Sequence, residues 1–174
     1  MILVNLYGGP GSGKSTMAAS IFSELKWKGI NCELVTEYAK DKVWEGSLNI
    51  LDNQLYVLAK QYHKLFRLKN KVEVIITDSP LLFSLFYGES MSNNFKNLVF
   101  DLYQEFHNID IFLNRQKPYN PSGRLQTEDV AKSIDISIKQ ILKNKGISYF
   151  SIDGEKSEVK TIVQIIEFAR KRQL

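Results

Sequence analysis

The chain carries a glycine-rich segment whose residue types are suited to holding phosphate groups. It runs Gly8-Gly9-Pro10-Gly11-Ser12-Gly13-Lys14-Ser15 and is followed by Thr16, which matches the P-loop pattern. Glycines let successive backbone N–H groups turn toward one anion, because no Cβ atom obstructs the turn. Lys14 suits the β- and γ-phosphates, and the Ser15 hydroxyl suits Mg²⁺. The segment predicts an ATP site formed by Gly8, Gly9, Gly11, Ser12, Gly13, Lys14, Ser15 and Thr16.

The flanking sequence supplies the context that a P-loop requires. Residues 1–7 are an apolar run of buried-strand length, and residues 16–28 read as a helix with Met17, Ile21 and Leu25 one turn apart. The positive end of that helix's dipole would add to anion binding. The alternative is a glycine-rich turn without a ligand, but a strand, a glycine-rich loop and a helix in that order favour a nucleotide site.

Two carboxylates follow predicted strands. Asp78 ends the run 74–77, the Walker B arrangement that holds Mg²⁺; alternatively, it caps a helix after Pro80. Glu37 follows a predicted strand over 30–36, where it can face an acceptor and take or hold a hydroxyl proton. Alternatively, Glu37 is an exposed residue in the first turn of a helix.

The segment from about 115 to 127 is predicted to be a lid. It follows a predicted strand over 109–113, is polar, and contains two prolines and a glycine between Arg115 and Arg124. In a phosphotransferase such a loop closes over the nucleotide, and its arginines neutralise charge on the transferring phosphoryl group. The alternative is a solvated loop with scattered cations.

Four further polar residues are weaker candidates for contact with ligands. Tyr38, Gln54 and Gln61 could reach an acceptor, and Gln54 and Gln61 are two turns apart on one predicted helix. Plain polar surface explains them nearly as well. Asp153 follows a predicted fifth strand and could line the adenine of ATP, although a generic turn explains it equally well.

Length and composition favour a soluble globular protein. The 174 residues are enough for one domain with a sizeable core, and 44% are hydrophobic and 24% charged. One cysteine, Cys32, excludes an internal disulfide and fits a reducing cytoplasm. No run approaches membrane-spanning length, and we expect neither a signal peptide nor a membrane partner. The net charge of +4 suits a phosphate-bearing ligand and permits nucleic acid.

The predicted elements alternate between strands and helices. Strands are expected over 2–7, 30–36, 72–77, 109–113 and 147–152, and helices over 16–28, 49–68, 93–107, 128–143 and 157–172. Alternation with short connections predicts an α/β fold in which helices cover both faces of a parallel sheet of about five strands. Ligands of such folds bind at the carboxyl ends of the strands, where Glu37, Asp78, Arg115 and Asp153 lie.

Four segments together resemble small P-loop ATPase or kinase proteins of tailed bacteriophages. They are residues 8–16, Val35-Thr36-Glu37-Tyr38-Ala39-Lys40, Ile76-Thr77-Asp78-Ser79-Pro80-Leu81-Leu82 and Tyr119-Asn120-Pro121-Ser122-Gly123-Arg124. The phage proteins are similar to the kinase domain of nicotinamide riboside kinases and, more distantly, to deoxynucleoside and thymidylate kinases. Some are described as 5-hydroxymethyluracil DNA kinases, which phosphorylate a modified base within DNA. The resemblance spans nearly the whole chain.

The resemblance implies roles for individual residues. It assigns Lys14, Ser15 and Thr16 to phosphate and Mg²⁺, Glu37 to the acceptor side, Asp78 to the metal or the proton, and Arg124 to the lid. Thymidylate kinases usually carry Asp-Arg-Tyr or Asp-Arg-Phe where this chain has Asp78-Ser79-Pro80. The missing arginine weakens the case for a nucleoside monophosphate acceptor, whose phosphate needs a bidentate partner; lysines 40, 42, 60 and 64 replace it only in part.

The residues and the resemblance together predict a nucleoside or nucleotide kinase in the host or cell cytoplasm. We expect ATP- and Mg²⁺-dependent transfer of a phosphoryl group to a hydroxyl, with Lys14, Glu37, Asp78, Arg115 and Arg124 in catalysis. The favoured acceptor is a 5-hydroxymethyl-pyrimidine in phage DNA, and a free nucleoside or nucleoside monophosphate is the alternative. A regulatory ATPase that switches a protein partner is an alternative of another class. The sequence leaves the oligomeric state open, a homodimer included.

Overall fold

The protein is built on a parallel five-stranded sheet with the strand order β2-β3-β1-β4-β5. The computed structural model describes residues 1–116 and 127–172. The strands are β1 (Ile2–Tyr7), β2 (Cys32–Val35), β3 (Val74–Thr77), β4 (His107–Asn114) and β5 (Phe150–Asp153). The first strand is central, because Val4 aligns with Ile76 on one side and Ile109 on the other. The predicted α/β architecture is confirmed.

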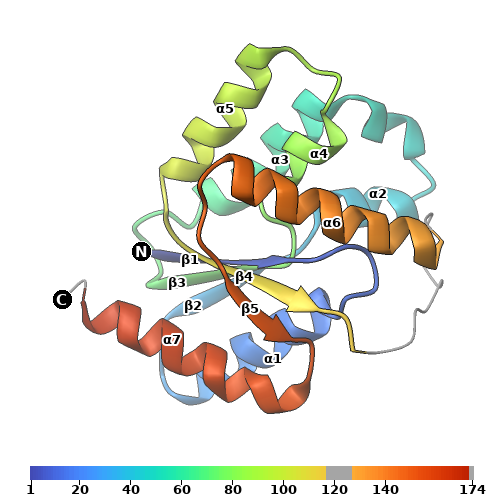
Figure 1. Ribbon diagram of the computed structural model, residues 1–174. Coiled ribbons are helices and arrows are strands. Elements are labelled where there is room, and N and C mark those ends of the chain that lie inside the picture. The colour runs from blue at the N-terminus through green and yellow to red at the C-terminus, as the bar shows by residue number, and fades with distance from the viewer. Residues whose placement is uncertain (117–126, 173–174) are drawn as a thin grey trace.

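Seven α-helices are described around this sheet. They are α1 (Lys14–Trp27), α2 (Tyr38–Trp44), α3 (Gln54–Phe66), α4 (Phe83–Tyr87), α5 (Asn93–Gln104), α6 (Glu128–Asn144) and α7 (Val159–Lys171), with short 3₁₀ helices η1 (Leu48–Asp52) and η2 (Lys156–Glu158). Figure 1 shows α1 and α7 below the sheet and α3 to α6 above it. None of the helices in the described part of the chain is long and apolar enough to cross a membrane.

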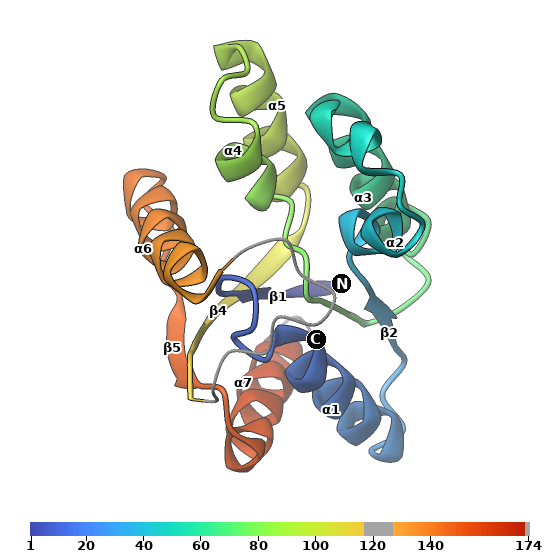
Figure 2. The same ribbon diagram turned by 90° about the vertical axis from the view of Figure 1, so that its right-hand side faces the viewer.

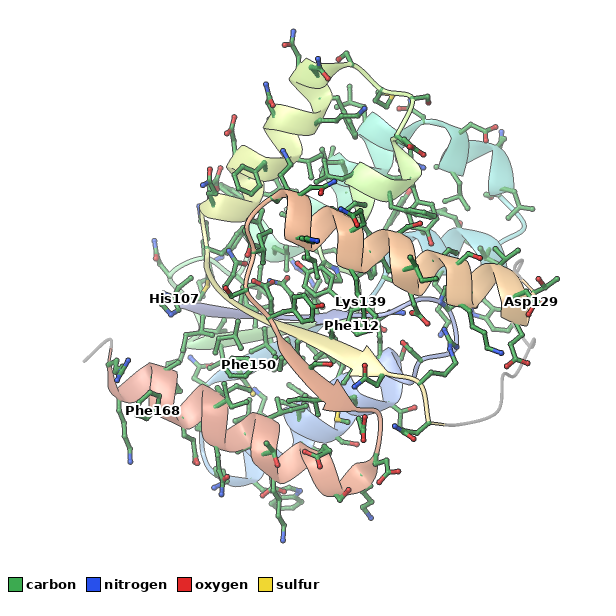
Figure 3. The ribbon with its side chains drawn as sticks, viewed as in Figure 1. His107, Phe112, Asp129, Lys139, Phe150 and Phe168 are labelled. Atoms are coloured by element: carbon green, nitrogen blue, oxygen red, sulfur yellow. The ribbon has the colours of Figure 1, made fainter. Side chains whose placement is uncertain are left out.

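Alternation along β1 supplies both halves of the core. Ile2, Val4 and Leu6 face α1 and α7, while Leu3 and Tyr7 face the other layer. Because both faces of the strand are covered, all six of its residues are buried and only Asn5 among them has a polar amide side chain. A cation–π contact adds to this packing, because the ammonium of Lys139 in α6 lies 4.3 Å from the centre of the Phe112 ring. Both side chains are labelled in Figure 3.

The prediction of one long helix over 49–68 is wrong, because the helical structure is interrupted at Asn53. Residues 48–52 form η1, and α3 begins at Gln54. The Asn53 side chain accepts a hydrogen bond from the Tyr56 N–H at 3.1 Å, so it caps the new helix. Smaller differences occur elsewhere: β2 spans only four residues, α5 ends at Gln104 so that His107 begins β4, and β5 begins at Phe150.

A buried carboxylate joins β1, β4 and α5. Asp110 accepts hydrogen bonds from the hydroxyls of Tyr7 at 3.0 Å and Tyr103 at 2.6 Å, and from the Asn5 amide at 3.0 Å. Burial raises the pKa of the Asp110 carboxyl, and the hydrogen bonds from its three partners oppose that rise. This network fixes α5 on the sheet and leaves Asp110 no free face toward a ligand.

We expect Asp110→Ala to lower the free energy of unfolding by about 3 kcal/mol, because three buried donors lose their acceptor. Urea unfolding measures the change, and Asp101→Ala on the exposed side of α5 is the matched control, expected to fall within about 0.5 kcal/mol of the wild type. A loss below about 1 kcal/mol for Asp110→Ala would contradict the structural role of the network.

Candidate functional site

The glycine-rich loop lies at the carboxyl edge of the sheet, between β1 and α1. Figure 2 looks onto this edge and shows the loop between α6 and α1. Gly8 and Gly13 have φ angles of +137° and +92°, which residues with a Cβ atom rarely adopt. The turn ends with α1 beginning at Lys14. The first N–H groups of that helix have no partner within the helix, so they form an anion-binding end.

Lys14 reaches back over the loop. Its ammonium donates to the carbonyl oxygens of Gly8 at 2.7 Å and Gly9 at 3.1 Å and lies 5.7 Å from the centre of the Phe83 ring. Burial lowers the pKa of Lys14, while the nearby carboxylates of Glu37 and Asp78 act in the opposite direction. The loop thus has a cation at its centre with two acidic groups close to it.

Asp78 follows β3 and is buried, with 4% of its surface exposed. Its Oδ1 atom has no hydrogen-bond partner among the described residues. The next helix, α4, begins five residues later at Phe83, so Asp78 does not cap a helix, and the helix-cap alternative is wrong. An orphaned buried carboxylate oxygen beside a P-loop fits the hard oxygen ligands that Mg²⁺ prefers.

The Ser15 hydroxyl and Asp78 are the two side chains suited to hold Mg²⁺ here. Ser15 lies exposed in the first turn of α1. Within residues 1–116 and 127–172 no group of three or more His, Cys, Asp or Glu side chains could hold a metal ion. The donor set therefore fits a magnesium ion that takes its remaining ligands from phosphate and water.

Glu37 stands at the junction of β2 and α2. It occupies the N-cap position of α2 with extended backbone, and its side chain lines the cavity described below. Burial raises the pKa of Glu37, and the charge of Lys14 opposes that rise. A partly buried carboxylate with a raised pKa can exchange a proton nearer to neutral pH than an exposed one.

Gln61 holds the segment that carries Glu37. It is 5% exposed, and its Oε1 atom accepts a hydrogen bond from the Tyr38 N–H at 3.0 Å. The Tyr38 ring packs edge-on against Tyr56, with centroids 6.1 Å apart. Neither Gln61 nor Tyr38 is among the residues that line the cavity, whereas Gln54 is. Gln54 also donates to the Leu51 carbonyl at 2.6 Å.

One cavity of about 330 Å³ joins the P-loop to Glu37. The loop and the start of α1 form one end, with Gly8, Gly9, Pro10, Gly11, Gly13, Lys14, Ser15 and Thr16. The polar groups at the other end are Glu37, Lys40 and Gln54. The remaining wall is mostly apolar, comprising Ala39, Val43, Leu51, Val57, Phe83, Phe86, Tyr87, Ile134 and Ile138.

The apolar wall was not part of the sequence prediction. Phe83, Phe86 and Tyr87 come from α4, and Ile134 and Ile138 come from α6. The run Phe83-Ser84-Leu85-Phe86-Tyr87 and the four-residue step in α6 are visible in the sequence. These patterns indicate buried residues, but they do not show that α4 and α6, which are separated by residues 88–127, meet over the P-loop.

Three further predicted residues do not line the cavity or lie outside the described chain. Asp153 accepts a hydrogen bond from the Asn114 side chain at 3.1 Å and is not in the cavity lining. Arg115 binds Asp135 and the Pro10 carbonyl. Arg124 and the rest of the predicted lid between 117 and 126 lie outside the residues that the structure describes.

Comparisons with known proteins agree with this geometry. No curated protein matches the chain. Among solved structures, the Mycobacterium tuberculosis APS kinase CysC in complex with AMPPNP and APS has the same fold, with a TM-score of 0.51 and 14% identity over 95% of this chain and 96% of that one. The AAA_28 family, described as an AAA domain, matches residues 3–158. The chain therefore belongs to the AAA_28 family, and its fold is that of a kinase-type P-loop NTPase.

Proposed function

We propose that the protein transfers the γ-phosphoryl group of ATP, with Mg²⁺, to the hydroxyl of a nucleoside-like acceptor. The observation that carries this proposal is the single cavity that joins the P-loop to Glu37 and an apolar wall. A site that only hydrolysed ATP would need room for water beyond the γ-phosphate, whereas this cavity extends over aliphatic and aromatic side chains. The APS kinase of the same fold holds a nucleotide analogue together with a second ligand.

The phosphate end of the cavity is built from backbone and one lysine. The free N–H groups at the start of α1 bind phosphate oxygens, and the helix dipole favours their negative charge. The Lys14 ammonium exchanges the carbonyls of Gly8 and Gly9 for the β- and γ-phosphates. Ser15 and Asp78 would hold Mg²⁺, which would supply positive charge against the charge that develops on the phosphate oxygens.

Glu37 is the group that receives the acceptor's proton. The acceptor oxygen forms a bond to the γ-phosphorus as the bond from that phosphorus to the bridging oxygen breaks, and ADP leaves with the electron pair. The hydroxyl proton passes to Glu37. The sequence is compatible with either Glu37 or Asp78 in this role. Glu37 lines the cavity and Asp78 does not, which supports Asp78 at the metal and Glu37 at the hydroxyl.

The wall of the cavity supports an acceptor that has a flat apolar body and lacks a phosphate at this end. Phe83, Phe86 and Tyr87 suit contact with a planar ring. The described lining has two side-chain cations, Lys14 and Lys40, and no arginine fork for a second phosphate. A nucleoside monophosphate is therefore the least favoured acceptor.

Among acceptors with a flat ring and a hydroxyl, a 5-hydroxymethyl-pyrimidine in DNA remains the favoured one. Its hydroxymethyl group would reach Glu37 only if the base left the helical stack and entered the cavity, as other enzymes that act on bases in DNA require. The net charge of +4 suits contact with the DNA backbone. A free nucleoside with the same ring and hydroxyl is the alternative.

We expect Glu37→Gln to lower kcat by about 10³-fold, because the hydroxyl loses its proton acceptor. In the wild type, kcat/KM should rise with pH as Glu37 loses its proton, with a midpoint above the ordinary glutamate pKa, since burial raises that pKa. The glutamine variant should lack this rise. Glu45→Gln, at the exposed end of α2, is the control. An unchanged kcat and pH profile in Glu37→Gln would remove Glu37 from the reaction.

The proposed function is tested by transfer of label from γ-³²P-ATP with Mg²⁺. Free nucleosides, nucleoside monophosphates and DNA containing 5-hydroxymethyluracil are assayed side by side, with Lys14→Met as the inactive control. Label on the DNA supports the favoured acceptor, and label on a free nucleoside supports the alternative. Label on the monophosphates alone contradicts the inference that the acceptor lacks a phosphate. Release of free phosphate alone, abolished in Lys14→Met, would replace transfer with a switch ATPase.

A further inference from the structure

Asp135, on the inner side of α6, contacts the P-loop directly. Its Oδ1 atom accepts a short hydrogen bond from the Gly9 N–H. Its Oδ2 atom accepts one from the Arg115 guanidinium at 2.9 Å. The Asp135 side chain is 19% exposed and that of Arg115 is 12% exposed. This carboxylate therefore binds two parts of the chain that both lie at the carboxyl edge of the sheet.

Arg115 contacts the same loop one residue further along. Its second terminal nitrogen donates to the Pro10 carbonyl at 2.8 Å, while its Nε atom is buried without a partner among the described residues. Both terminal nitrogens of the guanidinium are thus engaged with protein groups. Asp135 and Arg115 together hold the Gly9 N–H and the Pro10 carbonyl, which belong to consecutive residues in the first half of the loop.

Close packing limits how far this half of the loop can move. A Cβ atom on Gly9 would lie 2.5 Å from the Ala131 carbonyl oxygen of α6 and 3.0 Å from Asp135 Oδ1. The backbone therefore approaches α6 as closely as a glycine permits. The loop is fixed against α6 by contact as well as by hydrogen bonds.

The charges of the pair reach the phosphate site. Among the influences on the Lys14 pKa, after burial and the carboxylates of Glu37 and Asp78, are Asp135, which raises it, and Arg115, which lowers it. Asp135 alone would place a negative charge beside a loop that must hold a triphosphate. Arg115 cancels that charge while both groups keep their contacts with the loop.

We propose that Asp135 and Arg115 form a neutral clamp that holds the first half of the P-loop in its phosphate-binding shape. In this role Arg115 is a positioning residue that compensates the charge of Asp135, and it does not act on the transferring phosphoryl group. The inference requires only that the loop binds nucleotide, so it stands whether the chain transfers phosphate or hydrolyses ATP.

The clamp is tested by isothermal titration of Mg²⁺-ATP into four proteins: the wild type, Arg115→Met, Asp135→Asn and the double variant. We expect the Kd of Arg115→Met to rise about 30-fold, because an uncompensated carboxylate then faces the nucleotide. Asp135→Asn should raise Kd by only about threefold, since its amide oxygen still accepts from the Gly9 N–H. The double variant should return to within about fivefold of the wild type, because no unpaired charge remains.

Rescue in the double variant separates the clamp from a direct role of Arg115. A double variant as weak as Arg115→Met, or weaker, would mean that Arg115 binds the nucleotide itself, and it would overturn the proposal. Asp129→Asn is the matched control; this residue projects from the N-terminal end of the same helix (Figure 3) and is exposed. If Arg115→Met does not fold, Arg115→Lys replaces it, and its Kd should lie between those of the wild type and Asp135→Asn.

Turnover supplies a second readout. In a steady-state assay of ATP consumption, run with or without an acceptor, Arg115→Met should raise the KM for ATP about 30-fold. Its kcat should change by less than about threefold. A fall in kcat of about 10³-fold at unchanged KM is the result expected of an arginine that stabilises the transition state. That result would also overturn the clamp.

Discussion

The close packing of the loop between β1 and α1 is the constraint on which the rest of the site depends. The loop touches α6 through Gly9 and the turn after β5 through Ser12, where a Cβ atom on Gly154 would lie 2.9 Å from the Ser12 carbonyl oxygen. At Gly9 and at Gly154 there is room for the glycine hydrogen atoms but not for a Cβ atom. Helix α6 and the turn after β5 therefore hold the loop that leads into α1 from two sides. The N–H groups proposed to bind phosphate are thus oriented before any ligand arrives.

The second constraint is electrostatic. Lys14 lies near the carboxylates of Glu37, Asp78 and Asp135, and the negative charge of each raises the pKa of Lys14 against the effect of burial. A bound triphosphate changes this balance, because it adds negative charge where three carboxylates already lie. Arg115 compensates Asp135 and Mg²⁺ compensates Asp78 in the proposed site, which leaves Glu37 to accept a proton. Each carboxylate thus has a different partner, and the partners give them different roles.

The features that could be predicted from the sequence are those that local residue patterns determine. The P-loop, the five strands and the longer helices follow from glycine spacing and apolar runs, and the structure has them, whereas the short helices α2 and α4 were not predicted. The break at Asn53 has a local cause that the helical pattern masked, since that residue caps α3. The apolar wall from α4 and α6 and the pairing of Arg115 with Asp135 depend on contacts between segments far apart in the chain. Spacing alone does not predict such contacts.

A crystal structure with AMPPNP, Mg²⁺ and the acceptor analogue that binds would test most directly whether one cavity serves both substrates. We expect the γ-phosphate beside the Lys14 ammonium, the metal on Ser15 and Asp78, and the acceptor hydroxyl between Glu37 and the γ-phosphorus. The ring of the acceptor should lie against Phe83, Phe86 and Tyr87. A γ-phosphate that faces away from Glu37, or an acceptor bound outside this cavity, would contradict the claim that one cavity serves both substrates.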